Sequence, residues 1–542
     1  MVNFVRQHTN PPVFIISLAV LAAFTLFGAL FTGVIADGAG AIQGFIVDYF
    51  GWLYIIGVSF MLIFVVFIGF SRYGRIKLGP DDSRPEFSNT AWFAMLFTAG
   101  MGIGLVFWGV GEPVFHFQSP PVGEAETEAA AQNAMNYTFF HWGLHPWAVY
   151  ILLGLSLGYA AFRRGLPLRP SSIFYPIIGD RAFGPIGNSI DILAVFGTIF
   201  GLATSLGLGA TQINFGLNFL FGVSEGAGSQ IAIVGVITAV ALISVMLGIH
   251  GGIRRLALIN LVLAVILAAF VLIAGPTLYL LNSLATNVGY YVQNLPQTSF
   301  SMYTYAEGGA GWLGDWTLFY WAWWISWSPF VGMFIARISY GRSIRQFVAV
   351  MLLAPSGASF VWFTIFGNTA LSSLMAGEGG GLASLESDAR DGMFALFSQL
   401  PLGALGGVLS FLAIIVVALF FITSSDSGSL VVDILTNGGD PNPIWQTRSM
   451  WAIIEGAVAA VLLGAGGLIA LQTASLIAGL PLTVVLLLMC YALLKALQQE
   501  QLPARAPDAL QPPEPGRAAT RPRGTPAPQQ VRSENPQDST RS

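Results

Sequence analysis

The chain alternates between long apolar runs and short polar segments along almost its whole length. A helix of about 20 apolar residues is long enough to cross the hydrocarbon core of a bilayer. Runs of this kind predict an all-α polytopic membrane protein with twelve transmembrane helices. They cover residues 12–36, 50–70, 89–109, 135–161, 188–221, 229–248, 256–281, 316–337, 347–374, 403–434, 449–463 and 467–494.

The composition agrees with this interpretation. Hydrophobic residues make up 55% of the 542 positions and charged residues only 9%, whereas soluble domains carry roughly 25% charged residues. The net charge is −4 and no basic block stands out, so no nucleic-acid partner is expected. The single cysteine, Cys490, excludes a framework of internal disulfides.

Arginine and lysine gather in alternate loops, which predicts the orientation because such loops face the cytoplasm. Both termini are then cytoplasmic, in a bacterial inner (plasma) membrane. The first apolar run is too long for a signal-peptide core and is interpreted as a retained anchor. The basic loop residues are Arg72, Arg75, Lys77, Arg84, Arg163, Arg164, Arg169, Arg181, Arg254, Arg255, Arg337, Arg342, Arg345 and Arg448, while Arg390 falls on the opposite side.

The last segment, residues 495–542, loses the apolar pattern and is rich in proline from Pro503 onwards. Such a composition predicts a disordered cytoplasmic tail. Its arginines are scattered, so a solvated tail is favoured over one that binds anionic membrane lipid.

Three glycines crowd one apolar run, at Gly100, Gly102 and Gly104. Glycine costs a helix interior about 1 kcal/mol relative to alanine. A GxxxG packing surface explains Gly100 and Gly104 but leaves Gly102 unexplained. We therefore predict that this helix breaks where a small molecule binds.

A second run, from Tyr320 to Arg337, contains Ser328-Pro329 in its middle. Proline removes a backbone donor, so the helix is expected to loosen around Ile325. Interruptions at matching places in two halves of a chain indicate a transporter site near the membrane midplane. The predicted organisation is a cytoplasmic N-terminus (1–11), two additional helices (12–88), repeat 1 (89–281), an extracellular connection (282–315), repeat 2 (316–494) and the tail (495–542).

Aromatic side chains form two clusters in the sequence, each beside a proline. Aromatic boxes suit quaternary ammonium groups, which bind π faces with about 0.5–2 kcal/mol per face when desolvated. An interfacial belt or ordinary packing is the alternative for any single tryptophan. The clustered residues are Trp142, Trp147 and Tyr150, beside Pro146, and Trp323, Trp324 and Trp327, beside Pro329.

Two other motifs contain side chains that could bind an ion. His141 and His145 have zinc-helix spacing, but position 142 is Trp where a metalloprotease needs glutamate, so packing or hydrogen bonding is favoured. Near the end of the tenth run lie the hydroxyls of Thr423, Ser424 and Ser425. They suit a sodium ion, or alternatively bond back to their own helix.

At these residues the sequence resembles the betaine/carnitine/choline transporter family. The motifs are Gly100–Pro113, Phe139–Tyr150, Phe319–Ser339 and Thr423–Ser429. The resemblance covers about residues 10–495. It implies twelve spans with two inverted five-helix repeats, as in sodium-coupled amino-acid transporters, and a homotrimer.

The resemblance also implies site residues. The box around the trimethylammonium group consists of Trp142, Trp147, Tyr150 and Trp324, with Trp323 and Trp327 along the permeation path and Gly102 and Gly104 beside it. The main sodium site consists of Thr98, Met101, Phe420, Thr423 and Ser424. Sodium is thus expected as the coupling ion, with no organic cofactor and no enzymatic activity.

Two departures from the family pattern limit what is carried over. A second sodium site would use Thr198, Phe330 and Thr473, but the next turn offers Leu202 in place of a threonine, which puts this site in doubt. The tail lacks the long charged helix of osmosensing members, so osmotic activation is not carried over.

Gly104 carries no charge, whereas choline-carrying members of the family often have aspartate at this position. A neutral place suits a zwitterion such as glycine betaine, or dimethylsulfoniopropionate. The expected function is sodium symport of this compatible solute; the alternative is a choline or carnitine carrier working by proton symport or substrate exchange. The sequence contains no nucleophile–base motif of the kind that a lipid-modifying enzyme needs. Its helices also lack the polar stripes that a channel needs.

Overall fold

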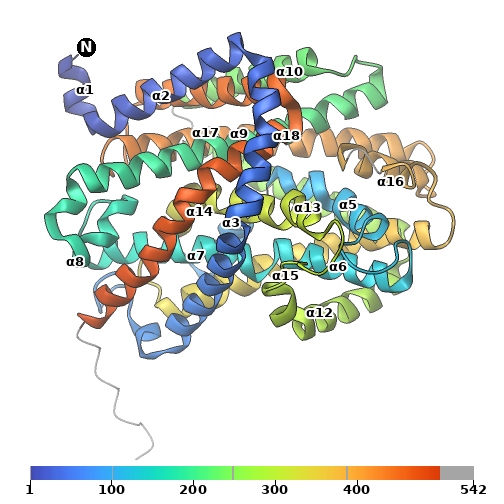
Figure 1. Cartoon of the computed structure of the whole chain (residues 1–542), viewed down its shortest axis with the longest axis horizontal. Coiled ribbons are helices and arrows are strands. Elements are labelled where there is room, and N and C mark those ends of the chain that lie inside the picture. Colours follow the sequence, from blue (N-terminus) through green and yellow to red (C-terminus); the bar gives the residue numbers. More distant parts are fainter. Residues whose placement is uncertain (1, 101, 247–249, 386–388, 501–542) are drawn as a thin grey trace, which may run out of the picture. The chain divides into compact units, whose positions relative to one another are not determined.

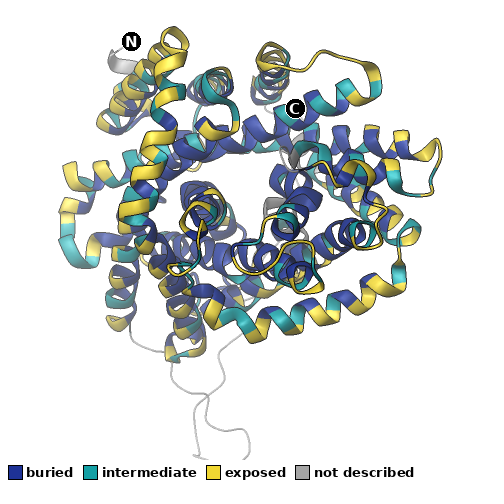
Figure 2. Ribbon diagram, turned by 45° about the vertical axis from the view of Figure 1, so that its right-hand side comes forward, coloured by how far each residue is buried: buried dark blue, intermediate teal, exposed yellow. Residues whose placement is uncertain are grey.

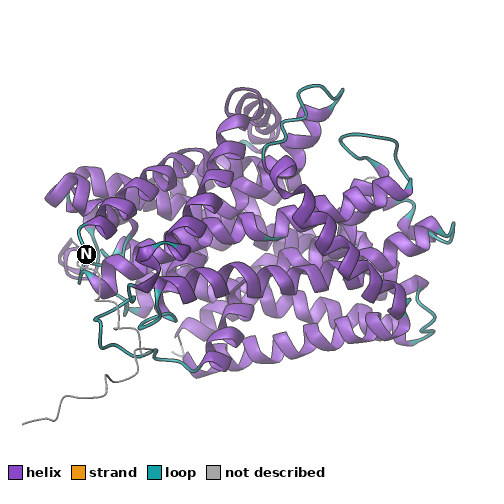
Figure 3. Cartoon of the chain, turned by 90° about the horizontal axis from the view of Figure 1, so that it is seen from below, coloured by secondary structure: helices purple, strands orange, loops and turns teal. Residues whose placement is uncertain are grey.

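The computed structural model describes residues 2–100, 102–246, 250–385 and 389–500, and these ranges consist of helices and loops (Figure 1, Figure 3). The predicted all-α polytopic class is confirmed. The predicted tail lies outside the described residues from position 501 onwards. The α-helices are α1 Val2–His8, α2 Pro11–Leu30, α3 Thr32–Phe70, α4 Asn89–Gly100, α5 Ile103–Gln118, α6 Glu128–Trp142, α7 Leu144–Gly158, α8 Tyr175–Ile178, α9 Pro185–Phe221, α10 Ala227–Met246, α11 His250–Ala274, α12 Thr277–Ser299, α13 Gly309–Leu313, α14 Phe319–Arg337, α15 Ile344–Met375, α16 Gly392–Gln399, α17 Leu405–Thr436 and α18 Trp445–Gln498.

Among the described residues, nine helical segments are long and apolar enough to cross a membrane. The number differs from the predicted twelve partly because the run 89–109 is divided between α4 and α5, with 12 and 16 residues. The count of twelve spans and the two inverted repeats therefore stay predictions.

The two last predicted spans meet inside one long helix, α18. Gly467 interrupts it with φ 57° and ψ −132°, a left-handed conformation that glycine adopts without steric cost. The kink falls at the predicted start of the run 467–494. Figure 1 shows α18 running past α3, against which it packs.

The helices near the N-terminus differ from the predicted runs. Helix α2, which corresponds to the predicted run 12–36, ends at Leu30, and α3 begins at Thr32 rather than near residue 50. One polar side chain in the added part of α3 has a distant partner, since the Gln43 amide donates to Asp315 at 3.2 Å. This partner, distant in sequence, is not visible in the local pattern.

The loosening predicted for the run from Tyr320 to Arg337 is not seen, because α14 is continuous through Pro329. The Ser328 hydroxyl donates to the Ile325 carbonyl at 2.7 Å. That carbonyl is the one that loses its helical donor to the proline. The neighbouring serine thus supplies the missing hydrogen bond and keeps the helix intact.

Glycines let α14 approach two neighbouring helices closely. A Cβ on Gly154 of α7 would lie 3.0 Å from the carbonyl oxygen of Gly332 in α14. A Cβ on Gly201 of α9 would lie 3.1 Å from the backbone nitrogen of Trp327. The helices α7, α14 and α9 therefore meet backbone to backbone, the packing typical of small residues in membranes.

The outer helices carry exposed apolar side chains, while the surfaces between helices are buried (Figure 2). Lipid tails are as apolar as these side chains, so an outer apolar surface is expected of a membrane protein. Examples are Leu26 and Leu30 on α2, Val236 on α10 and Ile273 on α11.

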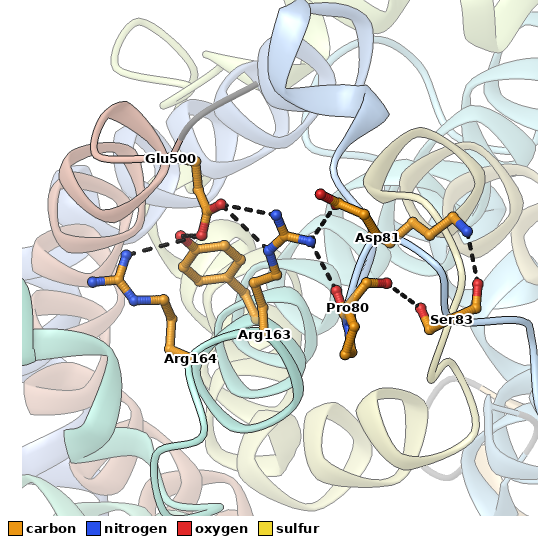
Figure 4. Close-up of polar contacts among 9 residues, drawn as sticks. Pro80, Asp81, Ser83, Arg163, Arg164 and Glu500 are labelled. Atoms are coloured by element: carbon orange, nitrogen blue, oxygen red, sulfur yellow. Dashed lines mark hydrogen bonds and ion pairs between the residues drawn. The ribbon is translucent and has the colours of Figure 1, made fainter. Parts of the chain in front are cut away.

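Basic loops that are far apart in sequence lie together. The Leu78 amide donates to the Arg342 carbonyl at 2.8 Å. The Arg163 guanidinium lies between Asp81, at 2.5 Å, and Glu500, at 3.0 Å (Figure 4). We call the surface formed by these loops the basic face; its assignment to the cytoplasm stays a prediction.

Candidate functional site

The predicted break in the glycine run is present. Helix α4 ends at Gly100 and α5 begins at Ile103, with Gly102 in an extended conformation (φ −114°, ψ −168°). Met101 lies outside the described residues, and the side chain of Thr98 is not described. The backbone groups freed at this break are the feature that a bound ligand or ion requires.

The glycines beside the break contact the aromatic residues directly. A Cβ on Gly104 would lie 2.7 Å from the outer ring atoms of both Trp142 and Trp323. A Cβ on Gly102 would lie 3.2 Å from the ring of Trp327. Glycine is thus required at position 104 because two indoles occupy the space of a side chain, an account that GxxxG helix packing does not give.

The four predicted box residues form one connected cluster of buried rings. Trp142 and Trp324 have centroids 4.9 Å apart and planes at 72°. Tyr150 lies 6.3 Å from Trp324 and 5.4 Å from Trp147. Helices α6, α7 and α14 therefore bring together residues that are up to 182 positions apart in sequence, from Trp142 to Trp324.

The chain turns between α6 and α7 at Gly143, whose φ of −98° and ψ of −129° are not helical. Pro146 lies in the first turn of α7, where its missing N–H costs nothing. Trp142 is the last residue of α6, and Trp147 and Tyr150 lie on α7. The turn at Gly143 thus places Trp142 on a different helix from the other two.

The two remaining tryptophans extend the cluster. Trp323 stacks on Trp324 at 4.7 Å and 15°, and Trp327 lies 6.5 Å from Tyr150. Among the described residues, the buried Trp327 Nε1 and Tyr150 hydroxyl have no hydrogen-bond partner. Two donors are therefore available inside an otherwise aromatic site, which suits a ligand with an acceptor group.

A cavity of about 510 Å³ reaches the edge of this cluster at Trp327 and extends to the predicted ion ligands. The four box residues do not line it. Its lining also includes the exposed side chains of Glu86 and Arg337, so it opens beside the basic face. The predicted site residues that line it are Gly102, Trp327, Phe330, Phe420, Thr423 and Ser424.

Comparison with known proteins identifies the family. The model of the betaine/carnitine/choline family transporters (BCCT) matches residues 12–502. The chain belongs to this family. A glycine betaine transporter of Acinetobacter baylyi is 47% identical over 491 residues, covering 91% of this chain and 74% of that protein. A glycine betaine transporter of Bacillus subtilis is 45% identical over 502 residues, covering 92% and 97%.

A third relative of this transporter carries a broader name. It is a glycine betaine/proline/choline transporter of Vibrio parahaemolyticus, 42% identical over 509 residues and covering 90% of each chain. Membership of the family agrees with the expectation of a multi-span membrane transporter rather than an enzyme.

The hydroxyls predicted as sodium ligands of the transporter lie on α17. The Thr423 hydroxyl donates to its own helix, with Leu419 O at 2.8 Å and Phe420 O at 3.1 Å. It therefore shows the back-bonding that was the alternative, while Thr423 and Ser424 both line the cavity. The sodium assignment stays a prediction.

The residues of the doubtful second sodium site have separate surroundings. The Thr198 hydroxyl donates to Ala194 O at 2.8 Å, within its own helix. The Thr473 hydroxyl lies 3.3 Å from Ala39 O, on α3. Leu202 occupies the space in front of Gly428, so the position of the missing threonine is filled by packed methyl groups.

The histidine pair forms no shared ligand set in this transporter. The ring of His145 stacks on Trp321 at 5.4 Å and 13°, whereas His141 Nδ1 faces Glu112 at 2.7 Å. Packing and hydrogen bonding, the favoured interpretation of the pair, agree with these contacts.

Glu112 is a residue of this site that the motifs did not single out. Its buried carboxylate accepts the Trp142 indole N–H at 2.7 Å. A signal was present, since Glu112 follows the predicted run 89–109 by three residues and a carboxylate at membrane depth is rare and indicates function. Its partners, however, come from other helices and cannot be read from the run itself.

Proposed function

We propose that the chain is a sodium symporter that imports a quaternary-ammonium or sulfonium zwitterion, with glycine betaine first and dimethylsulfoniopropionate second. The observation that carries the proposal is the buried aromatic cluster with two unpartnered donors, on Tyr150 and Trp327. The π faces attract the onium group, and the two donors suit its carboxylate. The glycine betaine transporters among the relatives support this substrate class.

Sodium coupling rests on the cavity beside the helix break. Phe420, Thr423 and Ser424 line the same space as Gly102 and Trp327. An ion held there would lie next to the ligand site, so the binding of one would favour the binding of the other. We propose one sodium site, because Leu202 packs against Gly428 where the second would need a hydroxyl.

Transport by alternating access fits the cavity's opening. With the basic face in the cytoplasm, the cavity leads from Trp327 to the cell interior, as expected of an inward-open state. Import of glycine betaine would provide the cell with a compatible solute for osmoprotection.

Uptake by proteoliposomes tests the proposal. Labelled glycine betaine, dimethylsulfoniopropionate, choline and carnitine would be offered with and without an inward sodium gradient. We expect sodium-driven accumulation of the two zwitterions and much weaker uptake of choline. Rapid betaine counterflow without sodium would instead support substrate exchange, and uptake driven by a proton gradient alone would support proton symport.

Removal of both hydroxyls, in Thr423→Ala with Ser424→Ala, tests the ion site. We expect a rise of at least about fivefold in the sodium concentration for half-maximal uptake, because two hard oxygen ligands are lost. A change of this size is typical of the coupling between two linked binding sites. Ser427→Ala is the matched control, since it removes a hydroxyl from the same helix and cavity. Wild-type sodium activation in the double variant would exclude this site.

A further inference from the structure

A buried carboxylate behind the aromatic cluster has no part in the proposed binding or coupling steps. Glu112 lies on α5 with a fully buried side chain. Four side-chain groups from three helices approach it, namely His116 on α5, His141 and Trp142 on α6, and Tyr320 on α14. A buried charge is tolerated only where such partners satisfy it.

Each carboxylate oxygen of Glu112 has two partners. Oε2 accepts the Trp142 indole N–H at 2.7 Å and the Tyr320 hydroxyl at 2.5 Å. Oε1 lies 2.7 Å from His141 Nδ1 and 3.3 Å from His116 Nε2. An ionised carboxylate only accepts, so in that state both imidazole nitrogens would donate to it.

The outer shell of this network agrees with that assignment. With a hydrogen on Nδ1, a neutral His141 has an acceptor at Nε2, and the Thr317 hydroxyl lies 2.9 Å from it. The carboxylate thus faces four possible donors, while the buried His116 Nδ1 has no hydrogen-bond partner among the described residues.

The two partners of Oε2, Trp142 and Tyr320, both contact Trp324 of the aromatic cluster. Trp142 is held at its N–H by Glu112 and at its other end by contact with Gly104. Tyr320 stacks on Trp324 at 5.7 Å and 25°. One carboxylate oxygen therefore sets the position of a ring on α6 and of a ring on α14 at the same time.

We propose that Glu112 is a positioning residue for ligand recognition, in that its carboxylate orients Trp142 and Tyr320 and so shapes the face that receives the onium group. This inference rests on the proposed function. A hydrogen bond to an anion is stronger than a neutral one and also draws positive charge to the N–H edge of the indole. The π face of Trp142 then becomes more negative and attracts a cation more strongly.

A double-mutant cycle tests the proposal with the full-length transporter in proteoliposomes, using the dissociation constant for glycine betaine. Glu112→Gln should raise this constant about fivefold or more in the wild-type background. In a Trp142→Phe background, Glu112→Gln should have a smaller effect, about threefold or less, because phenylalanine has no N–H to orient and only the Tyr320 hydroxyl remains. Equal effects in both backgrounds would overturn the proposal.

Two further variants separate positioning from a general loss of structure. Trp147→Phe does not touch Glu112, so its effect should add to that of Glu112→Gln without coupling. If Glu112→Gln does not fold, Tyr320→Phe removes one partner of Oε2 and should still raise the dissociation constant about threefold; an unchanged constant would overturn the proposal. Failure of the wild type itself to bind any onium compound would instead contradict the proposed function.

Discussion

Replacement of Trp324 by alanine should raise the dissociation constant for glycine betaine at least about tenfold, equivalent to about 1.4 kcal/mol. Trp324 contacts Trp142, Tyr150 and Trp323, so its removal opens the centre of the aromatic cluster. Trp142→Ala should have an effect of the same order, with the added loss of a donor to Glu112. Titration of the purified variants with glycine betaine measures both effects.

Substitutions that keep or remove the π face distinguish cation–π binding from packing. Trp324→Phe should retain more affinity than Trp324→Leu, because a weaker π face survives. Trp321→Phe is the matched control, since Trp321 is equally buried on the same helix but stacks on His145 instead. Equal affinities of the Phe and Leu variants would exclude the cation–π assignment.

Gly104→Ala should impair uptake strongly. The added Cβ would lie 2.7 Å from the rings of Trp142 and Trp323, so both indoles would have to move. Overpacking of this kind costs typically about 1–3 kcal/mol, which corresponds to a loss of roughly five- to more than a hundredfold in binding. The ratio of uptake rate to half-saturation concentration in proteoliposomes measures the loss.

Two glycine variants control for the substitution itself. Gly102→Ala meets only Trp327, at 3.2 Å, and should lose less activity than Gly104→Ala. Gly235→Ala lies on α10 with open space around its Cβ and should behave as wild type. Nearly normal uptake by Gly104→Ala would mean that the two indoles yield easily and do not shape the site.

The first helix break was predictable because its cause is local. Glycine at positions 100, 102 and 104 weakens the helix whatever its neighbours, and the break is found at Gly102. The predicted loosening of the run from Tyr320 to Arg337 was wrong, because the adjacent Ser328 hydroxyl replaces the hydrogen bond that Pro329 cannot donate. Whether that hydroxyl turns back to its own helix depends on its rotamer, which the sequence does not specify.

The aromatic cluster was predictable as a set of residues but not as an arrangement. Spacing places Trp323 and Trp327 on one face of a helix, yet the contact of Trp142 with Trp324 depends on how α6 and α14 pack. The same holds for Glu112, whose partners come from α5, α6 and α14. A network that spans three helices follows from tertiary structure, and the single-helix patterns contain no trace of it.

The glycine contacts of α14 also determine which part of the site can move. Helices that touch backbone to backbone resist shear, so α7, α14 and α9 should behave as one rigid body that carries Tyr150 and Trp324. Trp142 and Gly104 belong to α6 and α5, and Gly143 is the joint between Trp142 and that body. A ligand would then be bound or released by displacement of α5 and α6 from this rigid body, and that displacement would have to break the hydrogen bond between Glu112 on α5 and Tyr320 on α14.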